Sequence, residues 1–516
     1  MTNSSPVTQA LPIHAPGQKT KRWAALATLM LPVLLVSVDN TVLSFAVPAI
    51  AQALSPSSSE QLWIIDAYSL VLAGLLVPMG SLSDRWGRRR MLIIGCVGFA
   101  LISALAAFAP TALALVIARA LLGIFGAMLM PATLSLIRNI FIDPAERRTA
   151  IAVWAAMFSG GAALGPIVGG FLLNHFSWGS VFLMAVPILV IFLAVAPFLL
   201  PESKDPNPGP VDPMSIVLIM VSMISLTFGL TQISESGVDV YTSSAIIIGL
   251  VIGYFFVRRQ LAREIPMLDV RLFNNSVFSG ALIANLFSMV VDVGFLYFVS
   301  QHLQLVSGMD PMRAGLFLVP GLAMTILSGL YVVKLVNRFH PATLVSVGLT
   351  LNAIAYVMVL LFGQDDLGLL IAFMVLGTGV GSSQTISNDL ILSSVPASKA
   401  GAASAISETS YEFGNVLGTV LIGGLLTVVY RAQIVVPEVF SHEQAEDAIE
   451  TLGGATRVAH EQGGDAGAAL LTSAQHAFDS GVIYSSTASA VLMVVLAIIS
   501  YRMLRKAPAH IEPAEH

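Results

Sequence analysis

Long apolar segments separated by short polar turns dominate the chain from Trp23 to Tyr501. A helix needs about 20 apolar residues to cross the hydrocarbon layer of a bilayer. Applied along the chain, this length predicts fourteen membrane-spanning helices and an all-α polytopic membrane protein. The predicted spans are 23–50, 62–81, 91–109, 111–133, 149–173, 179–200, 213–233, 242–257, 276–300, 312–335, 343–363, 367–388, 402–429 and 481–501.

The distribution of basic residues supports this count, because loops on the cytoplasmic side of a membrane are rich in Lys and Arg. With both termini in the cytoplasm, 21 of the 25 basic residues fall on the cytoplasmic side. Arg313, Arg431 and Arg457 fall outside, and Arg119 falls within a span. We therefore expect a multi-pass protein of a bacterial cytoplasmic (inner) membrane, with both termini in the cytoplasm.

Composition agrees with this assignment and excludes several other classes. The chain is 56% hydrophobic and 11% charged, whereas soluble domains contain about 25% charged residues. The net charge of −5 gives no indication of a nucleic-acid partner. A single cysteine, Cys96, excludes a disulfide within the chain and a cysteine-based metal cluster. Because the sequence contains neither a P-loop nor an HExxH motif, we expect no enzyme activity, no metal and no cofactor.

The segment 431–480 is the one long polar stretch between predicted spans. It falls on the outer side and contains eight acidic and two basic residues. An acidic outer segment could concentrate or release cations, but we expect a solvated spacer.

A weak internal repeat indicates a transporter. GSLSDRWGRRR (80–90) and VKLVNRFH (333–340) both fill a cytoplasmic turn and lie eight spans apart. Transporters often consist of two related halves with the substrate site at their interface. Eight spans between copies, rather than six, imply two extra helices in the middle. The expected organisation is a tail (1–22), an N-terminal bundle (23–201), a central region (202–275), a C-terminal bundle (276–503) that includes 431–480, and a second tail (504–516).

Five acidic residues lie inside predicted spans: Asp39, Asp66, Asp292, Glu408 and Glu412. A charge at mid-bilayer is costly, so each such residue is a functional hypothesis by default. Asp39 lies past the middle of its span. Asp66 lies about one turn from the outer end of its span, where a solvated or capping role is an equal alternative to function. Asp292 is a candidate for substrate contact.

Glu408 and Glu412 are four residues apart, so on a helix they share one face. At low dielectric, two neighbouring carboxyls favour the neutral form of each other, and the pair can hold either a proton or a lipophilic cation. Competition between the two is the simplest form of antiport. Tyr411 could stack on a delocalised cation. The alternative is a structural polar patch, satisfied by neighbours such as Ser407 and Asn415.

Several motifs resemble those of the major facilitator superfamily. GSLSDRWGRRR is similar to its loop motif, and ARALLGIFGAMLMPA (118–132) to its arginine-containing motif. GAALGPIVGG (161–170) is similar to the motif that marks its antiporters. DNTVLSFAVP, LWIIDAYSLVLAG and ISETSYEFGNVLG resemble the fourteen-span drug/proton antiporters, in particular QacA-like quaternary-ammonium exporters.

This resemblance implies a fold of two six-helix bundles with two extra central helices, working as a monomer. It implies export of lipophilic cationic drugs, dyes and quaternary ammonium biocides, driven by the proton gradient. The alternative is proton-coupled export of one specific physiological solute. By the same resemblance, Asp39, Glu408 and Glu412 bind protons and cations. A gating latch comprises Gly80, Asp84, Arg85, Gly87 and Arg119, although Arg119 has a structural pairing as an equal alternative. The antiporter motif comprises Gly161, Gly165, Pro166, Gly169 and Gly170.

Overall fold

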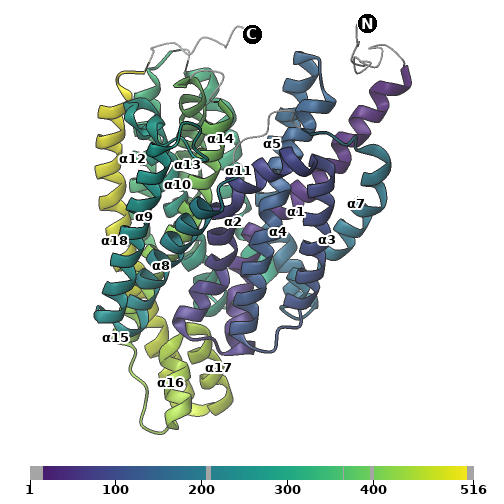
Figure 1. Cartoon of the computed structure of the whole chain (residues 1–516). Helices are drawn as coiled ribbons and strands as arrows, with labels where there is room; N and C mark the ends of the chain where they lie inside the picture. The colour runs from purple at the N-terminus through teal and green to yellow at the C-terminus, as the bar shows by residue number, and fades with distance from the viewer. Residues whose placement is uncertain (1–15, 205–210, 337, 364, 396–399, 508–516) are drawn as a thin grey trace, which may run out of the picture.

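The computed structural model describes residues 16–204, 211–336, 338–363, 365–395 and 400–507. Helices make up its ordered elements (Figure 1). The first half contains α1 (Pro16–Leu54), α2 (Ser58–Trp86), α3 (Arg88–Ala106), α4 (Ala112–Ile140), α5 (Pro144–His175), α6 (Ser180–Leu183) and α7 (Ala185–Leu199). Two further helices, α8 (Pro213–Ser236) and α9 (Val240–Ala262), follow.

The second half contains both α-helices and short helical segments of other types. Its elements are η1 (Val270–Asn274), α10 (Ser276–Gln301), η2 (His302–Val306), α11 (Pro311–Leu335), α12 (Pro341–Phe362), α13 (Asp366–Ser393), α14 (Ala400–Gly418), η4 (Thr419–Gly423), α15 (Gly424–Gln433), α16 (His442–Glu450), α17 (Leu452–Gln462) and α18 (Gly464–Leu504). Two of them, η2 and η4, are π-helical turns. Parts of both predicted tails, 1–15 and 508–516, and Asn337 of the predicted repeat lie outside the described residues.

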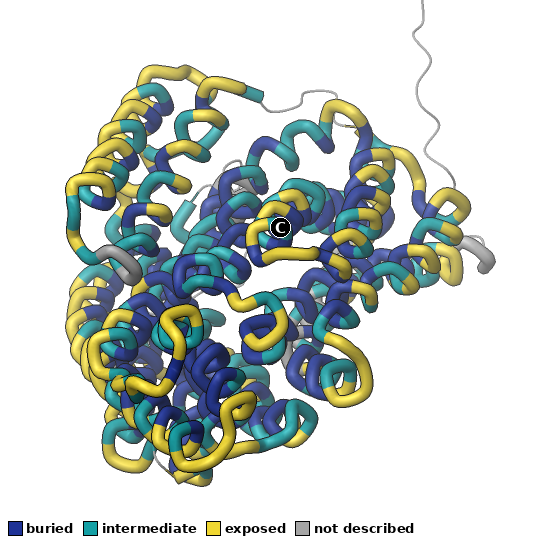
Figure 2. Tube along the Cα trace, turned by 90° about the horizontal axis from the view of Figure 1, so that it is seen from below, coloured by how far each residue is buried: buried dark blue, intermediate teal, exposed yellow. Residues whose placement is uncertain are grey.

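Thirteen helical spans among the described residues are long and apolar enough to cross a membrane. The remaining predicted span, 149–173, coincides with α5, several of whose side chains lie outside the described set. A total of fourteen spans therefore stays a prediction. Seen from below, exposed residues lie mainly around the periphery and buried residues in the interior (Figure 2). Large apolar side chains such as Leu105, Phe198 and Ile247 are exposed, as expected for helices that face lipid.

The helices form two hydrophobic cores. One core runs from Ala25 to Leu200 and the other, apart from Phe45, from Leu272 to Ala507. We call α1–α7 the N-half and α10–α18 the C-half. A small third cluster, which includes Leu70, Met223 and Val420, lies where α2, α8 and η4 meet. The pair α8–α9 thus packs against both halves near their interface.

The pair α8–α9 is held together by an ion pair at one end. The carboxylate of Asp212 accepts hydrogen bonds from Nε and Nη2 of Arg259, each at 2.9 Å, and lies 3.4 Å from Arg263. These contacts hold the pKa of Asp212 well below its usual range, and the hydrogen bond from Arg259 has the largest effect. Its charge is therefore fully present at neutral pH.

The predicted antiporter motif lies on α5, between the two halves. Gly161 and Gly169 face Ser37 and Val42 of α1, so that a Cβ atom on either glycine would lie 2.8 Å from those side chains. On another side, a Cβ atom on Gly170 would lie 2.6 Å from the Cα atom of Met312 in α11. Small residues allow such close approach of helix backbones. The motif therefore brings α5 against a helix of the other half.

The segment 431–480 is folded, so the expectation of a solvated spacer is wrong. It contains α16, α17 and the first part of α18, which begins at Gly464 rather than near 481. Leu452, Ala455 and Val458 are buried and join the core of the C-half. The apolar face of α17 explains this outcome, because its burial offsets the polar character of the segment. We call α16–α17 the cap. The end of the molecule that the cap covers is called the cap end, and it lies at the bottom of Figure 1.

The close approach at Gly170 leads to a test of the fold. Gly170→Ala would place a methyl group against the backbone of α11, and we expect a loss of about 1–3 kcal/mol in the free energy of unfolding. Gly160→Ala is the matched control on the same helix, because a Cβ atom there meets nothing within 4 Å. Thermal unfolding of the purified variants in detergent measures both. Equal stability of the two variants would contradict this packing.

Candidate functional site

A cavity of about 540 Å³ lies between the two halves. This volume is within the range of about 300–1,000 Å³ that is typical of small-molecule sites. Residues of α1, α2, α4 and α5 line one side, and residues of α10, α11, α13 and α14 line the other. Most of the wall is apolar, with side chains such as Leu43, Phe158 and Met289, and a few polar groups interrupt it.

Asp66 is a buried carboxyl group in the wall of this cavity. Its residue is only 1% exposed, and neither carboxylate oxygen accepts a hydrogen bond of normal geometry from the described residues, although Thr419 lies close to it. The alternative of a solvated or capping role is therefore wrong. Ser57 caps α2 together with Glu60, and Asp66 lies about two turns further into the helix.

Asp39 has a partner from another helix. Nη1 of Arg119 in α4 lies 2.8 Å from Oδ2 of Asp39 in α1, and the two side chains are 2% and 5% exposed. The Nε atom of Arg119 donates to the carbonyl of Ile64 at 3.1 Å, and its guanidinium lies 4.5 Å from the ring centroid of Tyr68. Sequence alone left this pairing open, because it identified no basic partner on the helix of Asp39.

Arg119 links this ion pair to the cavity. Its side chain forms part of the cavity wall, whereas Asp39 does not. Arg119 binds the carbonyl of Ile64, which is two residues before Asp66 in α2. The charge of Arg119 also acts on the carboxyl group of Asp66. One buried cation therefore serves two buried carboxyls from different helices.

The two glutamates of α14 lie in different surroundings and do not line the cavity directly. Glu412 is buried, accepts a hydrogen bond from Asn415 at 3.1 Å and lies close to Ser69 of α2. Glu408, one turn away, lies within electrostatic reach of Glu412 and of Arg138 in α4. Their predicted role in proton and cation binding stays a prediction. The α14 residues that reach the cavity are Tyr411 and Asn415.

The opposite wall contains Asp292 of α10, together with Tyr411 and Gln384. Tyr411 lies close to Gln384. Sequence analysis did not identify the amides of Asn40 and Gln384 as wall residues. Uncharged polar residues are common in membrane helices for packing reasons, so only the tertiary structure separates those that face the cavity. The described residues contain no group of three or more His, Cys, Asp or Glu side chains that could hold a metal ion.

Of the residues predicted as a latch, Arg119 lies in the cavity wall. The others, Gly80, Asp84, Arg85 and Gly87, lie at the end of the molecule opposite the cap, within the N-half. Asp84 pairs with Arg88 at 2.8 Å. Gly87 has a φ of 118°, which favours glycine, and the carboxylate of Glu202 fills the space next to it. Glu202 also accepts hydrogen bonds from the backbone of Arg89 and Arg90, each at 3.2 Å. Switching of this loop between partners stays a prediction.

At the cap end, polar contacts join the two halves. Hydrogen bonds connect Gln61 to Tyr297 at 2.8 Å, Asn174 to Asp310 at 3.1 Å and Gln304 to the carbonyl of Phe45 at 3.3 Å. From these contacts the cavity extends in the other direction, along α11 as far as Val333, near the end of that helix. The structure is thus closed at the cap end.

Comparison with known proteins identifies relatives over nearly the whole chain. Residues 29–419 match the family described as the Major Facilitator Superfamily. The multidrug efflux pump LfrA of Mycolicibacterium smegmatis is 52% identical over 482 residues, covering 93% of this chain and 96% of that protein. The methyl viologen resistance protein SmvA of Salmonella typhimurium is 34% identical, covering 94% and 99%.

Solved structures support the same fold. A bacterial homologue of the human lysosomal transporter Spinster aligns with 96% of this chain and 100% of its own, with a TM-score of 0.68 and 17% identity. A D-xylose–proton symporter aligns over 95% and 99%, with a TM-score of 0.61 and 15% identity. At these identities the likeness concerns the fold.

The buried pair of Asp39 and Arg119 leads to a test by double-mutant cycle. Removal of one partner leaves a buried charge unpaired, so we expect Arg119→Met and Asp39→Asn each to cost about 3–5 kcal/mol of stability. The double variant should lose less than the sum of the two. Thermal unfolding in detergent measures the cycle, and Arg138→Met, which removes an exposed arginine of the same helix, is the control. Additive effects would show that the two charges are not coupled.

Proposed function

The chain belongs to the major facilitator superfamily, and from that premise we propose that it is a proton-coupled antiporter that exports lipophilic cations from the cytoplasm. Membership in this family makes it a transporter and not an enzyme. Two relatives, one named as a multidrug efflux pump and one as a methyl viologen resistance protein, align with more than nine-tenths of the chain. They support a cargo of drugs, dyes and quaternary ammonium biocides.

The observation that carries this proposal is the carboxyl group of Asp66, which is buried in the cavity wall and accepts no hydrogen bond of normal geometry from the described residues. A buried carboxylate requires a counter-charge or a proton. A lipophilic cation in the cavity supplies the first, and proton uptake supplies the second. Because one carboxyl cannot be satisfied by both at once, each displaces the other, which is the requirement for antiport.

Arg119 couples this competition to Asp39. While Asp39 is ionised, its carboxylate balances the charge of Arg119 at a distance of 2.8 Å, and Asp66 can hold a cation. When a proton neutralises Asp39, the charge of Arg119 is no longer balanced there, and its field at Asp66 opposes a bound cation. In this scheme Asp66, Asp292 and Tyr411 contact the cargo. Asp39, Glu408 and Glu412 bind protons behind the cavity wall.

The orientation of the chain decides to which side of the membrane the cavity opens. We propose that the cap end faces the outside and that both termini face the cytoplasm, so the structure represents an inward-facing state. The three arginines placed outside by this orientation each have a carboxylate partner: Arg313 pairs with Asp310, Arg431 with Glu450, and Arg457 with Asp447. Their presence outside is therefore compatible with the preference for basic residues inside. The protein would act as a monomer in the bacterial cytoplasmic membrane, with the proton gradient as its energy source and no cofactor.

Ethidium efflux from energised cells tests this function. The wild-type protein should lower ethidium accumulation, and a protonophore should abolish the effect. We expect Asp66→Asn and Glu412→Gln to reduce the efflux rate at least about tenfold, which corresponds to about 1.4 kcal/mol. Glu264→Gln, an exposed carboxylate outside the spans, should retain the wild-type rate. Efflux that continues after collapse of the gradient, or that is unchanged in Asp66→Asn, would refute the mechanism.

A further inference from the structure

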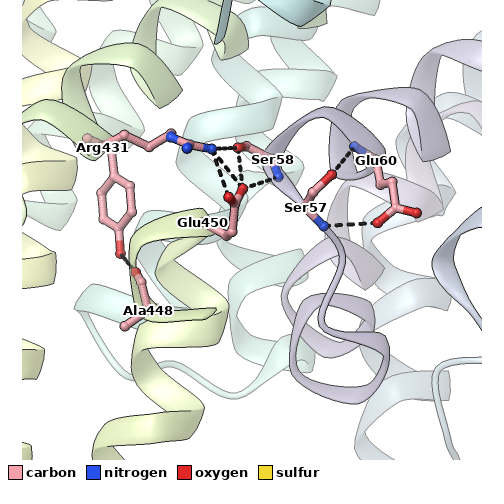
Figure 3. Close-up of polar contacts among 7 residues, drawn as sticks. Ser57, Ser58, Glu60, Arg431, Ala448 and Glu450 are labelled. Carbon is pink, nitrogen blue, oxygen red and sulfur yellow. Dashed lines mark hydrogen bonds and ion pairs between the residues drawn. The ribbon is translucent and has the colours of Figure 1, made fainter. Parts of the chain in front are cut away.

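The carboxylate of Glu450, the last residue of α16, binds groups from both halves (Figure 3). Its Oε2 atom accepts hydrogen bonds from the backbone N–H and the hydroxyl of Ser58 in α2, at 2.8 and 2.6 Å. Arg431 of α15 donates from Nη1 to both carboxylate oxygens at 2.9 Å, and to the Ser58 hydroxyl at 2.8 Å. We call these three residues the clasp.

The clasp uses the end of the helix that carries Asp66. Ser58 is the first residue of α2, and the helix is already capped by the reciprocal hydrogen bonds of Ser57 and Glu60. Further N–H groups at a helix start still need partners, and a negative charge is stabilised there. Glu450 therefore satisfies a backbone donor of α2 that the N-half itself leaves unpaired.

The cap is anchored in the C-half and only touches the N-half. The hydroxyl of Tyr430 donates to the carbonyl of Ala448 at 2.8 Å, and buried residues of α17 belong to the core of the C-half. Toward the N-half, Arg457 donates to the Ser55 hydroxyl at 3.0 Å, and Gly453 lies against Ala51 at the end of α1. These contacts are at the rim of the N-half, outside its hydrophobic core.

We propose that the clasp is a detachable gate, which closes the cavity at the cap end and must release α2 each time the cavity opens on that side. This inference rests on the proposed transport function. Loss of the clasp frees the start of α2, about two turns from Asp66. The Gln61–Tyr297 hydrogen bond on the next turn also joins the halves. Glu450 thereby sets the balance between the closed and open states of this end, without contacting the cargo.

Accessibility of the cavity tests the gate without any transport. In a Cys96→Ala background, Ser44→Cys introduces a thiol into the cavity wall, and a membrane-impermeant maleimide is added outside intact cells. We expect Glu450→Gln to increase the rate of labelling about tenfold, because it removes the charge that holds Ser58 and Arg431. Glu443→Gln, which removes an exposed carboxylate from the same helix, should leave the rate unchanged. Equal labelling in the two variants would overturn the proposal.

Cross-linking tests whether the cap must detach. A Cβ atom on Gly453 would lie 2.7 Å from the Cβ atom of Ala51, which is closer than the roughly 3.5–4.5 Å between the Cβ atoms of a disulfide. A small outward shift of the cap therefore brings the thiols of Ala51→Cys and Gly453→Cys to bonding distance, and Gly453→Ala controls for the effect of that shift. We expect oxidation to stop ethidium efflux and a reductant to restore it, with each single cysteine variant unaffected by oxidant. Export at the wild-type rate by the cross-linked protein would overturn the gate. If the wild-type protein itself exports no ethidium, the proposed function is refuted. The labelling experiment would then still show whether the clasp controls access to the cavity.

Discussion

The cost of burying charge governs this structure. Lipid offers no hydrogen bonds, so an ionised side chain inside a span must have a counter-charge, a polar partner or access to a cavity. The buried pair of Asp39 and Arg119 meets this requirement at 2.8 Å, and Glu412 meets it through the amide of Asn415. Asp66 is buried in the cavity wall near Arg119 and Thr419, but neither of its oxygens accepts a hydrogen bond of normal geometry from the described residues. A carboxyl group in this position can take up a proton or a cation.

The same requirement shapes the interface between the halves. At the cap end, hydrogen bonds and ion pairs such as those of Glu450 and Gln61 cross it, and glycines of α5 allow the backbone of α11 to come close. At the other end, polar groups find partners within their own half, as Glu202 does with the loop after α2. The two ends thus differ in the kind of contact as well as in closure, and this difference favours the state seen here.

A transporter of this kind needs its gate and its binding site to be physically connected, and α2 provides the connection. It begins at Ser58 under the clasp, contacts the other half through Gln61 and carries Asp66 in the cavity wall. The carbonyl of Ile64 on the same helix binds Arg119, the partner of Asp39. A displacement of this one rigid helix would therefore act on the gate, the cargo site and the buried ion pair together.

The sequence by itself determined the class, the helical architecture, the family and the set of acidic residues inside spans. These follow from local properties, namely the length of apolar segments, the placement of basic residues and short motifs. Only the tertiary structure decided which acids share a partner and which face the cavity. Asp39 and Arg119 are 80 residues apart, and Asp66 is buried in the cavity wall beside Arg119 of α4 and Thr419 of η4, which are distant from it in sequence. The fold of 431–480 was missed because its overall polarity was read as that of a solvated segment. The apolar face of α17 is a local pattern, but the surface of the C-half that covers it is visible only in the tertiary structure.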